Sequence, residues 1–334
     1  MTAGFLVVAQ ASLLAQVATE PSGFITLDIH GTGGVGSSAL SFIALGMTRP
    51  VEFRGTMESA GSFTVTDNQA TWVDNQFNGN NGLYFLELAS GTHAGLMTDI
   101  VATTAATKSL TVADDLSGIV LGGETYKIRK HWTLASVFGS ADESGLGGGN
   151  STTADEILIY DPVQSVYATY YYRTIAPVGW RSSADAFTDQ AGAKIELTKG
   201  IIIKRKQTSD LGVKLFGDVK LGYTAARIQT GVNIVANVYC TDTLTLGNSG
   251  LYTGDPVNGV AGGTSVTGDQ VLLYNGTGYA TYYFKTNTLG GAGWRSISDF
   301  FTDAANTIIP HGTSVVIQRT GGRQGFYWYA IQPF

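Results

Sequence analysis

A long stretch of this chain occurs twice, and the duplication limits the folds that the chain can adopt. Residues 155–205 and residues 269–319 share an aromatic run, ATYYYRT in the first copy and ATYYFKT in the second. In both copies Gly-Trp-Arg and then Phe-Thr-Asp follow, and an apolar run ending in arginine closes the copy. Short runs of aromatic and β-branched residues between turn residues are typical of paired β-strands. The sequence therefore predicts two related β units in one chain.

The composition indicates many short strands and argues against some classes of function. Of the 334 residues 44 are Gly, 14% are charged and 11% are aromatic, which favours strands joined by tight turns over a disordered chain. The net charge of -6 argues against electrostatic binding of nucleic acid. We therefore expect an all-β fold with two β-sandwich-like units and no nucleic-acid partner.

Weaker matches outside the two copies predict that the first unit is interrupted by an inserted module. We expect residues 19–50 and 131–206 to form the first unit and residues 207–334 to form the second. Residues 51–130 would form a small β-barrel, because short candidate strands alternate there with Gly and Asn turns. The candidate strands of this module are residues 51–56, 62–66, 70–73, 83–88, 98–102, 109–112 and 125–129.

The N-terminal residues 1–18 are predominantly apolar. Residues 3–15 resemble the apolar region of a secretory signal peptide, although the basic residues that usually precede such a region are missing. Gln10 and Ser12 interrupt the segment, which is too short to span a bilayer. We expect a secreted or cell-surface protein without a membrane span, in which residues 1–18 are either a cleaved signal or part of an assembly.

The two copies allow the chain to be compared with itself. Tyr160 and Tyr170 of the first copy match Tyr274 and Tyr282 of the second. At a further position tyrosine is replaced by phenylalanine, which indicates that the ring matters there and the hydroxyl does not. Aromatic rings on paired strands bury a large apolar area and pack against one another. We expect the four tyrosines to belong to the packing core of each unit.

Tryptophan, arginine and two aspartates also recur at matching positions. An arginine beside two carboxylates could serve a glycosidase-like acid/base pair, with aromatic residues stacking on sugar. It could also hold aspartates that cap a turn, while the tryptophan packs under the hairpin. The duplication favours this structural interpretation, because an enzyme seldom keeps one site in both halves. The residues are Trp180, Arg181, Asp185 and Asp189, matched by Trp294, Arg295, Asp299 and Asp303.

Other motifs predict no cofactor. Residues 31–36 fit the dinucleotide-binding pattern G-x-G-x-x-G, but no strand–helix rhythm follows, so we interpret them as a turn. Oxygen-rich residues from Asp74 onward partly resemble a calcium loop, but Phe85 stands where a bidentate Glu should be, so calcium near Asp74 is only an alternative. The single cysteine, Cys240, can form no internal disulfide and is expected to be a small buried side chain.

The C-terminal residues 325–334 are apolar on both faces of a predicted strand. Such a strand lies centrally in a sheet or is covered by a partner, because an uncovered one promotes aggregation. Phe326, Trp328 and Phe334 are therefore candidate residues for assembly by strand exchange between subunits.

Several segments resemble an uncharacterised family of secreted bacterial β proteins. The likeness covers most of the first unit and the inserted module, and the second unit matches more loosely. The module is also similar to small β modules of secreted and phage-tail proteins. The resemblance implies an all-β fold and an extracellular location, and it implies no catalytic residues. The segments are FITL (24–27), ATWVDNQF (70–77), YFLELASG (84–91), HWTL (131–134), DEILIY (155–160) and GWR (179–181).

The function that these observations favour is structural. We expect a self-associating subunit of an extracellular filament, sheath or surface layer, and not an enzyme. The first alternative is a carbohydrate-binding or adhesive surface module with a glycan partner. A less favoured alternative is a glycan hydrolase that uses Asp185 and Asp189.

Overall fold

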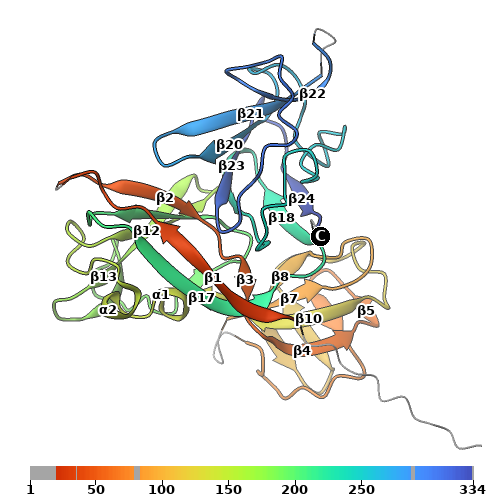
Figure 1. Ribbon diagram of the computed structural model, residues 1–334. Helices are drawn as coiled ribbons and strands as arrows, with labels where there is room; N and C mark the ends of the chain where they lie inside the picture. The colour runs from red at the N-terminus through yellow and green to blue at the C-terminus, as the bar shows by residue number, and fades with distance from the viewer. Residues whose placement is uncertain (1–19, 35, 79–82, 287–289, 333–334) are drawn as a thin grey trace, which may run out of the picture.

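The computed structural model describes residues 20–34, 36–78, 83–286 and 290–332. In these ranges the chain is nearly all β, which confirms the predicted all-β class. Figure 1 shows three lobes: the first unit with the long red and green strands, the inserted module in orange and yellow, and the second unit in blue.

The first unit is a sandwich of two sheets around one apolar core. Its larger sheet consists, in order, of β14 (Gly179–Ser182), β13 (Val166–Arg173), β12 (Glu156–Asp161), β16 (Ile201–Arg205) and β2 (Ala39–Ile43). The opposite sheet consists of β1 (Ser22–Ile29), β17 (Leu211–Val219) and β3 (Met47–Thr48). Buried and exposed residues alternate along β1 and β17, as expected for strands with one solvated face. The unit also contains the strand pair β11 (Trp132–Thr133) and β15 (Lys194–Ile195), and the short helices α1 (Leu134–Phe138) and α2 (Ala141–Ser144).

The second unit is built in the same way. Its larger sheet consists, in order, of β19 (Gly231–Ala236), β23 (Ser314–Arg319), β20 (Gln270–Tyr274), β21 (Tyr279–Lys285) and β22 (Gly293–Ser296). The opposite sheet is the pair β18 (Thr224–Ile228) and β24 (Phe326–Ala330). Val271, Trp294 and Trp328 belong to the apolar core between the two sheets.

The larger sheets of the two units match strand for strand. In each, the aromatic strand lies between its hairpin partner and the Gly-Trp-Arg strand. Tyr172 is therefore opposite Trp180, and Phe284 is opposite Trp294. The rings meet edge-on in both pairs, with centroids 5.5 Å and 5.7 Å apart. This agreement in strand order and register is what two copies of one β unit would produce.

The inserted module is a small barrel. Its seven-stranded sheet consists, in order, of β4 (Val51–Thr56), β10 (Thr125–Lys130), β7 (Tyr84–Leu88), β8 (Met97–Thr104), β9 (Ser109–Val112), β6 (Thr64–Thr66) and β5 (Ser59–Ala60). The outermost strands of this order, β4 and β5, are joined by Met57 and Glu58 alone, so the chain itself closes the sheet. Met57 is fully buried and packs with Trp72 and Tyr126 in the core of the module.

One predicted strand of the module, residues 70–73, is wrong. The Ala70 N–H donates to the Asp67 carbonyl, and the Val73 N–H donates to Oε1 of Gln76 (3.1 Å). These amides therefore serve turns and not a neighbouring strand. Trp72 is buried in the core without strand pairing, and its burial accounts for the apolar pattern that suggested a strand.

The boundary between the two units lies later in the chain than the sequence indicates. Residues 207–219 are assigned to the second unit from the sequence, but β17 pairs with β1 from Leu211 to Asp218. Val213 and Leu215 lie in the core of the first unit together with Leu27. The units therefore divide after Val219. The duplicated stretch ends at β16, so a comparison of the two copies gives no signal for the strand beyond it.

The C-terminal strand is buried inside the protein's own fold. Phe326 and Trp328 of β24 are 5% and 1% exposed and lie in the core of the second unit. Tyr327 and Tyr329, on the opposite face, pack against the module. The prediction that Phe326 and Trp328 are available for exchange between subunits is therefore wrong, because both lie in the core of their own unit. Phe334 and residues 1–18 lie outside the described residues.

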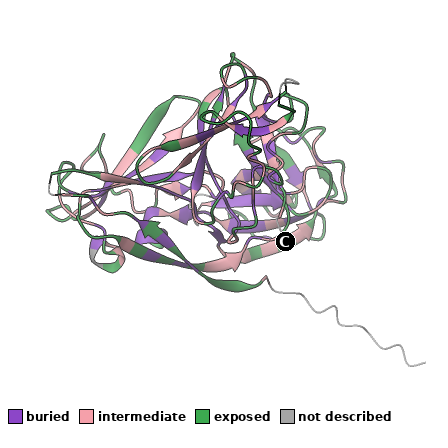
Figure 2. Ribbon diagram, turned by 45° about the horizontal axis from the view of Figure 1, so that its top comes forward, coloured by how far each residue is buried: buried purple, intermediate pink, exposed green. Residues whose placement is uncertain are grey.

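The two units pack on each other through the outer faces of their larger sheets. Phe42 and Ile202 of the first unit form an apolar cluster with Ile234 and Val316 of the second. The ring of Phe42 also lies 4.8 Å from the ring of Tyr274. Figure 2 shows buried segments gathered inside the molecule and exposed segments at loops and hairpin ends.

Candidate functional site

A buried ion pair joins the two ends of each duplicated stretch. Asp155 precedes β12 and Arg205 ends β16, and their side chains meet at 2.9 Å with 0% and 4% exposure. Asp155 also accepts backbone hydrogen bonds from Gly147 (2.7 Å) and Lys206 (2.6 Å). The second copy repeats this set with Asp269, Arg319, Ala261 and Thr320. A buried carboxylate with these partners is a structural device, since each charge is compensated inside the unit.

The recurring Trp-Arg pair is also used for packing. Trp180 and Trp294 are 2% and 3% exposed. The Arg181 guanidinium donates to the carbonyls of Trp180 (2.6 Å), Pro177 (3.1 Å) and Val178 (3.1 Å), and it pairs with Asp189 (3.1 Å). Arg295 makes the matching contacts with the carbonyls of Trp294, Gly290 and Gly291 and with Asp303. The arginine thus fastens the loop that precedes its own strand.

Asp185 and Asp299 cap loops in the two copies. Asp185 Oδ1 accepts the N–H groups of Phe187 (2.8 Å) and Thr188 (3.2 Å), and Asp299 has the equivalent partners. Hydrogen bonds from Thr188 and Phe187 hold the pKa of Asp185 below its usual value. A glycosidase general acid needs a raised pKa, so this environment argues against Asp185 in that role.

Each capped loop exposes a phenylalanine on top of a cation. We call residues 183–190 and 297–304 the tip loops. Phe187 is 75% exposed, and the centre of its ring lies 5.7 Å from the guanidinium carbon of Arg173. Phe301 is 62% exposed, and the centre of its ring lies 5.8 Å from Nζ of Lys285. Each cation also donates to a carbonyl of its own tip loop, Arg173 to Ala186 and Lys285 to Phe300. The two tip loops therefore hold an exposed ring in the same way.

The structure does not gather the repeat tyrosines into one site. Tyr170 and Tyr282 are half-buried against the cores of their own units. Tyr160 and Tyr274 pack against the cluster between the two units instead. These four tyrosines and the two buried tryptophans therefore serve packing.

A cluster of buried charges joins the module to both units. Arg129 of β10 is 1% exposed and contacts Glu20, Glu87 (3.4 Å) and Asp218 (3.6 Å). Glu87 also pairs with Lys220 at 2.9 Å, and Lys220 lies in the segment that links the two units. Burial alone would raise the pKa of Glu20, but hydrogen bonds and charges from Lys127 and Arg129 lower it to about 2. This junction cluster ties three separate cores into one body.

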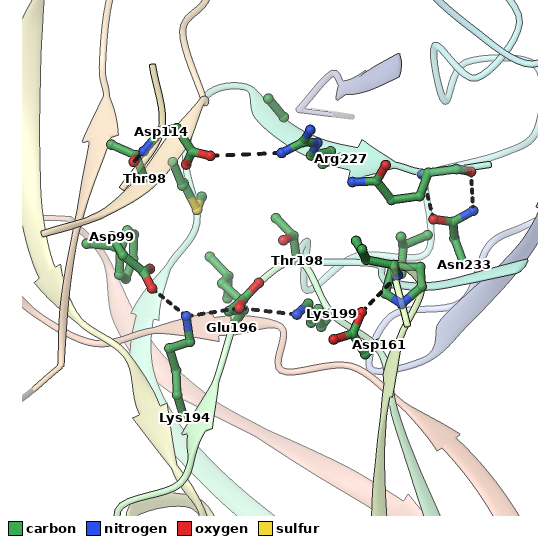
Figure 3. Close-up of a pocket in the computed structure, with 18 of the residues that line it drawn as sticks. Thr98, Asp99, Asp114, Asp161, Lys194, Glu196, Thr198, Lys199, Arg227 and Asn233 are labelled. Carbon is green, nitrogen blue, oxygen red and sulfur yellow. Dashed lines mark hydrogen bonds and ion pairs between the residues drawn. The ribbon is translucent and has the colours of Figure 1, made fainter. Parts of the chain in front are cut away.

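A cleft of about 360 Å³ opens beside this junction, and all three lobes line it. Figure 3 shows a row of alternating charges across it, in which Lys194 bridges Asp99 (2.5 Å) and Glu196 (3.0 Å) and Lys199 binds Glu196 at 3.2 Å. Arg227 of β18 lies on the far side, 3.9 Å from Asp114. The other residues that line the cleft include Thr98, Asp161, Pro162, Val163, Thr198, Gln229 and Asn233, with Tyr160 and Tyr327.

His131 anchors the module's end of this row. Its Nε2 lies 2.8 Å from Asp99 Oδ1, and its ring packs on Phe85 with centroids 4.7 Å apart. Nδ1 of His131 is buried and has no hydrogen-bond partner in the described part of the chain. Burial alone would raise the pKa of Asp99, but His131 and Lys194 lower it to about 2, so Asp99 stays ionised at neutral pH.

The described residues of the other candidate motifs lie in loops. The described residues contain no group of three or more His, Cys, Asp or Glu that could hold a metal ion. Asp74 accepts the Ala105 N–H at 2.7 Å, and residues 79–82 of the calcium-like loop lie outside the described ranges. Residues 31–34 form a loop between β1 and β2. Cys240 is half-buried and packs against the core of the first unit, so it is less covered than the buried side chain expected from the sequence.

The cleft is the part of the molecule that sequence reasoning missed. Asp99, Lys194 and Arg227 come from three lobes, and no motif spacing connects them. The buried Asp–Arg pairs could have been predicted from the sequence, because an aspartate begins and an arginine ends each copy of the duplicated stretch.

No family model, curated protein or solved structure matches the chain. Across the described ranges, no helix is long and apolar enough to cross a membrane. Function must therefore be inferred from the geometry of the chain itself.

Proposed function

We propose that the protein is a structural subunit of an extracellular assembly and that its copies join through the two tip loops. The observation that carries this proposal is the repeated exposed phenylalanine, Phe187 in one unit and Phe301 in the other. The recurring Trp180 and Trp294 are buried and serve packing. The recurring Tyr167 and Tyr279 are each 47% exposed, but their rings lie against Tyr160 and Tyr274 of the same hairpin. A ring that both copies hold out into solvent contributes nothing to the core, and exposed aromatic residues typically anchor interfaces.

The tip loops are also preorganised, which lowers the entropy cost of binding. Asp185 and Asp299 fix the backbone of the loop, and a strand-end cation supports the ring from below. Neighbouring apolar side chains widen each exposed surface: Ile175 and Val178 in the first unit, and Ile297 and Phe300 in the second.

Two equivalent contact points on one rigid body suit a linear polymer. The junction cluster and the apolar cluster between the units hold the two tip loops at a constant relative position. A subunit with two binding points at fixed geometry adds one neighbour at each end, which generates an open chain unless the geometry closes a ring. The extracellular setting of this proposal rests on the apolar residues 3–15, which lie outside the described ranges.

Light scattering of purified protein, with variants of the tip loops, tests the proposal. The wild type should form species larger than a monomer as its concentration rises, and Phe187→Ser combined with Phe301→Ser should remain monomeric. If the tips pair like with like, each single variant stops at the dimer, whereas pairing of the first tip with the second makes each single variant monomeric. Phe63→Ser is the matched control, because Phe63 is 50% exposed on the module. A wild type that is monomeric at every concentration would falsify the proposal.

A further inference from the structure

We propose that the cleft between the three lobes binds a neutral, hydroxyl-rich ligand, namely a short carbohydrate segment. The cleft is separate from the tip loops, so this inference does not depend on the assembly proposal. Its volume of about 360 Å³ lies in the range of small-molecule sites, and it occurs where such sites are common, at a junction of modules.

The charges of the cleft favour a ligand without net charge. The row Asp99–Lys194–Glu196–Lys199 alternates in sign, and each charge already has an opposite partner within 3.2 Å. An anionic ligand would meet the carboxylates of Asp99 and Glu196, and a cationic one would meet the two lysines. Hydroxyl groups both donate and accept hydrogen bonds, so a polyol can bind this row without separating its ion pairs.

The row keeps hydrogen-bonding capacity for such a ligand. Both lysines bind Glu196 through the same oxygen, Oε1. Lys199 has three N–H donors and contacts one acceptor among the described residues, and its side chain is 34% exposed. Hydrogen bonds to ionised groups are stronger than neutral ones, so Glu196 and Lys199 would contribute most of the polar recognition.

Other residues of the cleft suit the C–H faces of sugar rings. Tyr160 and Tyr327 are half-buried there, and Pro162 and Val163 of the first hairpin loop lie alongside them. Amphipathic tyrosines present an apolar ring and a polar hydroxyl together, as a sugar surface requires. The hairpin loop that brings in Val163 is two residues longer in the first copy than in the second, so this wall belongs to the first unit alone.

The row is held in place before any ligand arrives. His131 fixes Asp99, the ion pairs fix both lysines, and the junction cluster fixes the three lobes. Binding therefore costs little ordering of side chains, which favours a ligand in this cleft.

Saturation-transfer NMR and calorimetry with maltose, cellobiose, lactose and diacetylchitobiose test the inference, with digalacturonate as an anionic comparison. At least one neutral disaccharide should bind. Glu196→Gln and Lys199→Met should each weaken its binding by about tenfold or more, as expected for the loss of a charge-assisted hydrogen bond. Glu52→Gln, a partly exposed acid outside the cleft, should bind like the wild type.

Three results would overturn the inference: no binding of any neutral disaccharide, tighter binding of digalacturonate than of the neutral sugars, or full binding by both cleft variants. Circular dichroism of each variant checks its fold. Because Lys199 is partly exposed, Lys199→Met should fold even if Glu196→Gln does not, and the inference can then be tested with Lys199→Met alone.

Discussion

Asp155 lies at 0% side-chain exposure against Arg205, and Asp269 and Arg319 repeat this arrangement in the second unit. An aspartate with two backbone donors and a buried guanidinium cannot be exchanged for a neutral amide without leaving the arginine charge uncompensated. At the scale of single residues, these two pairs are therefore the positions at which the smallest chemical change should have the largest effect on stability.

We predict that Asp155→Asn and Asp269→Asn each lower the free energy of unfolding by about 3–5 kcal/mol, the usual cost of breaking a buried ion pair from one side. Urea denaturation followed by tryptophan fluorescence measures the change. Asp185→Asn is the control, because Asp185 is exposed and asparagine keeps an oxygen that accepts the same backbone hydrogen bonds, so this variant should be nearly as stable as the wild type. Equal effects of the buried and exposed variants would show that the pairs are not buried as described.

Glu20 predicts a pH dependence of stability. Its pKa is lowered from 4.5 to about 2 in the folded protein, so the unfolded chain takes up the proton first as the pH falls. The stabilisation by the Glu20 carboxylate is complete above about pH 5 and is lost as the pH falls towards about 2, and it amounts to at most about 3 kcal/mol.

The difference in unfolding free energy between wild type and Glu20→Gln should therefore be largest near neutral pH and shrink through this acid window. Urea denaturation at a series of pH values measures it. Glu52→Gln is the control, since Glu52 is 42% exposed and 4.0 Å from its partner, and its difference from wild type should stay near zero. If the difference in unfolding free energy between wild type and Glu20→Gln did not depend on pH, Glu20 would not be stabilised as a carboxylate in the junction cluster.

Residue roles inside the duplicated stretch were predictable because two copies can be compared. The interpretation of Trp180 and Arg181 as a packing device follows from their recurrence, and the structure places both in buried positions. The exposed Phe187 recurs as well, but recurrence alone does not tell a buried ring from an exposed one. Asp99 lies in the module, which has no second copy, so no comparison within the chain could indicate its partners.

At the scale of elements, β17 is the strand whose membership differs most from the sequence interpretation. It follows the first copy directly in the chain and alternates buried with exposed residues. Its inward residue Leu215 is 2% exposed in the core of the first unit, and its outward neighbour Phe216 is 64% exposed. The two adjacent residues therefore provide a matched pair for testing the assignment.

We predict that Leu215→Ala lowers the free energy of unfolding by about 2–5 kcal/mol, because it leaves a cavity in the core. Hydrogen exchange should quicken in β1 and β16 and stay slow in β23, since local stability follows cooperative units. Phe216→Ala loses only the cross-strand ring contact with Phe24 and should cost no more than about 1 kcal/mol. If hydrogen exchange quickens in β23 and not in β1, β17 belongs to the second unit and our assignment is wrong.

The strands themselves were largely predictable, since alternation and turn residues are local signals. In the module, six of the seven candidate strands form, and the failure at residues 70–73 comes from Trp72, which is buried without strand pairing. Which strands share a sheet was harder to predict. The pairing of β1 with β17 joins segments far apart in the chain, and it depends on tertiary packing that local patterns do not record.

At the scale of the whole molecule, three cores meet at one junction of buried charge. Arg129 and Lys220 tie the module to both units, and Phe42 with Val316 packs the larger sheets together. The tip loops therefore belong to one rigid body, so the contacts they make should be regular in any assembly.

Electron microscopy of concentrated wild-type protein tests the assembly proposal most directly. Two equivalent tips on a rigid body predict ordered filaments or closed rings with a constant repeat, which the double variant Phe187→Ser with Phe301→Ser does not form. Isolated single particles at the highest soluble concentration of the wild type, or filaments that persist unchanged in the double variant, would contradict it.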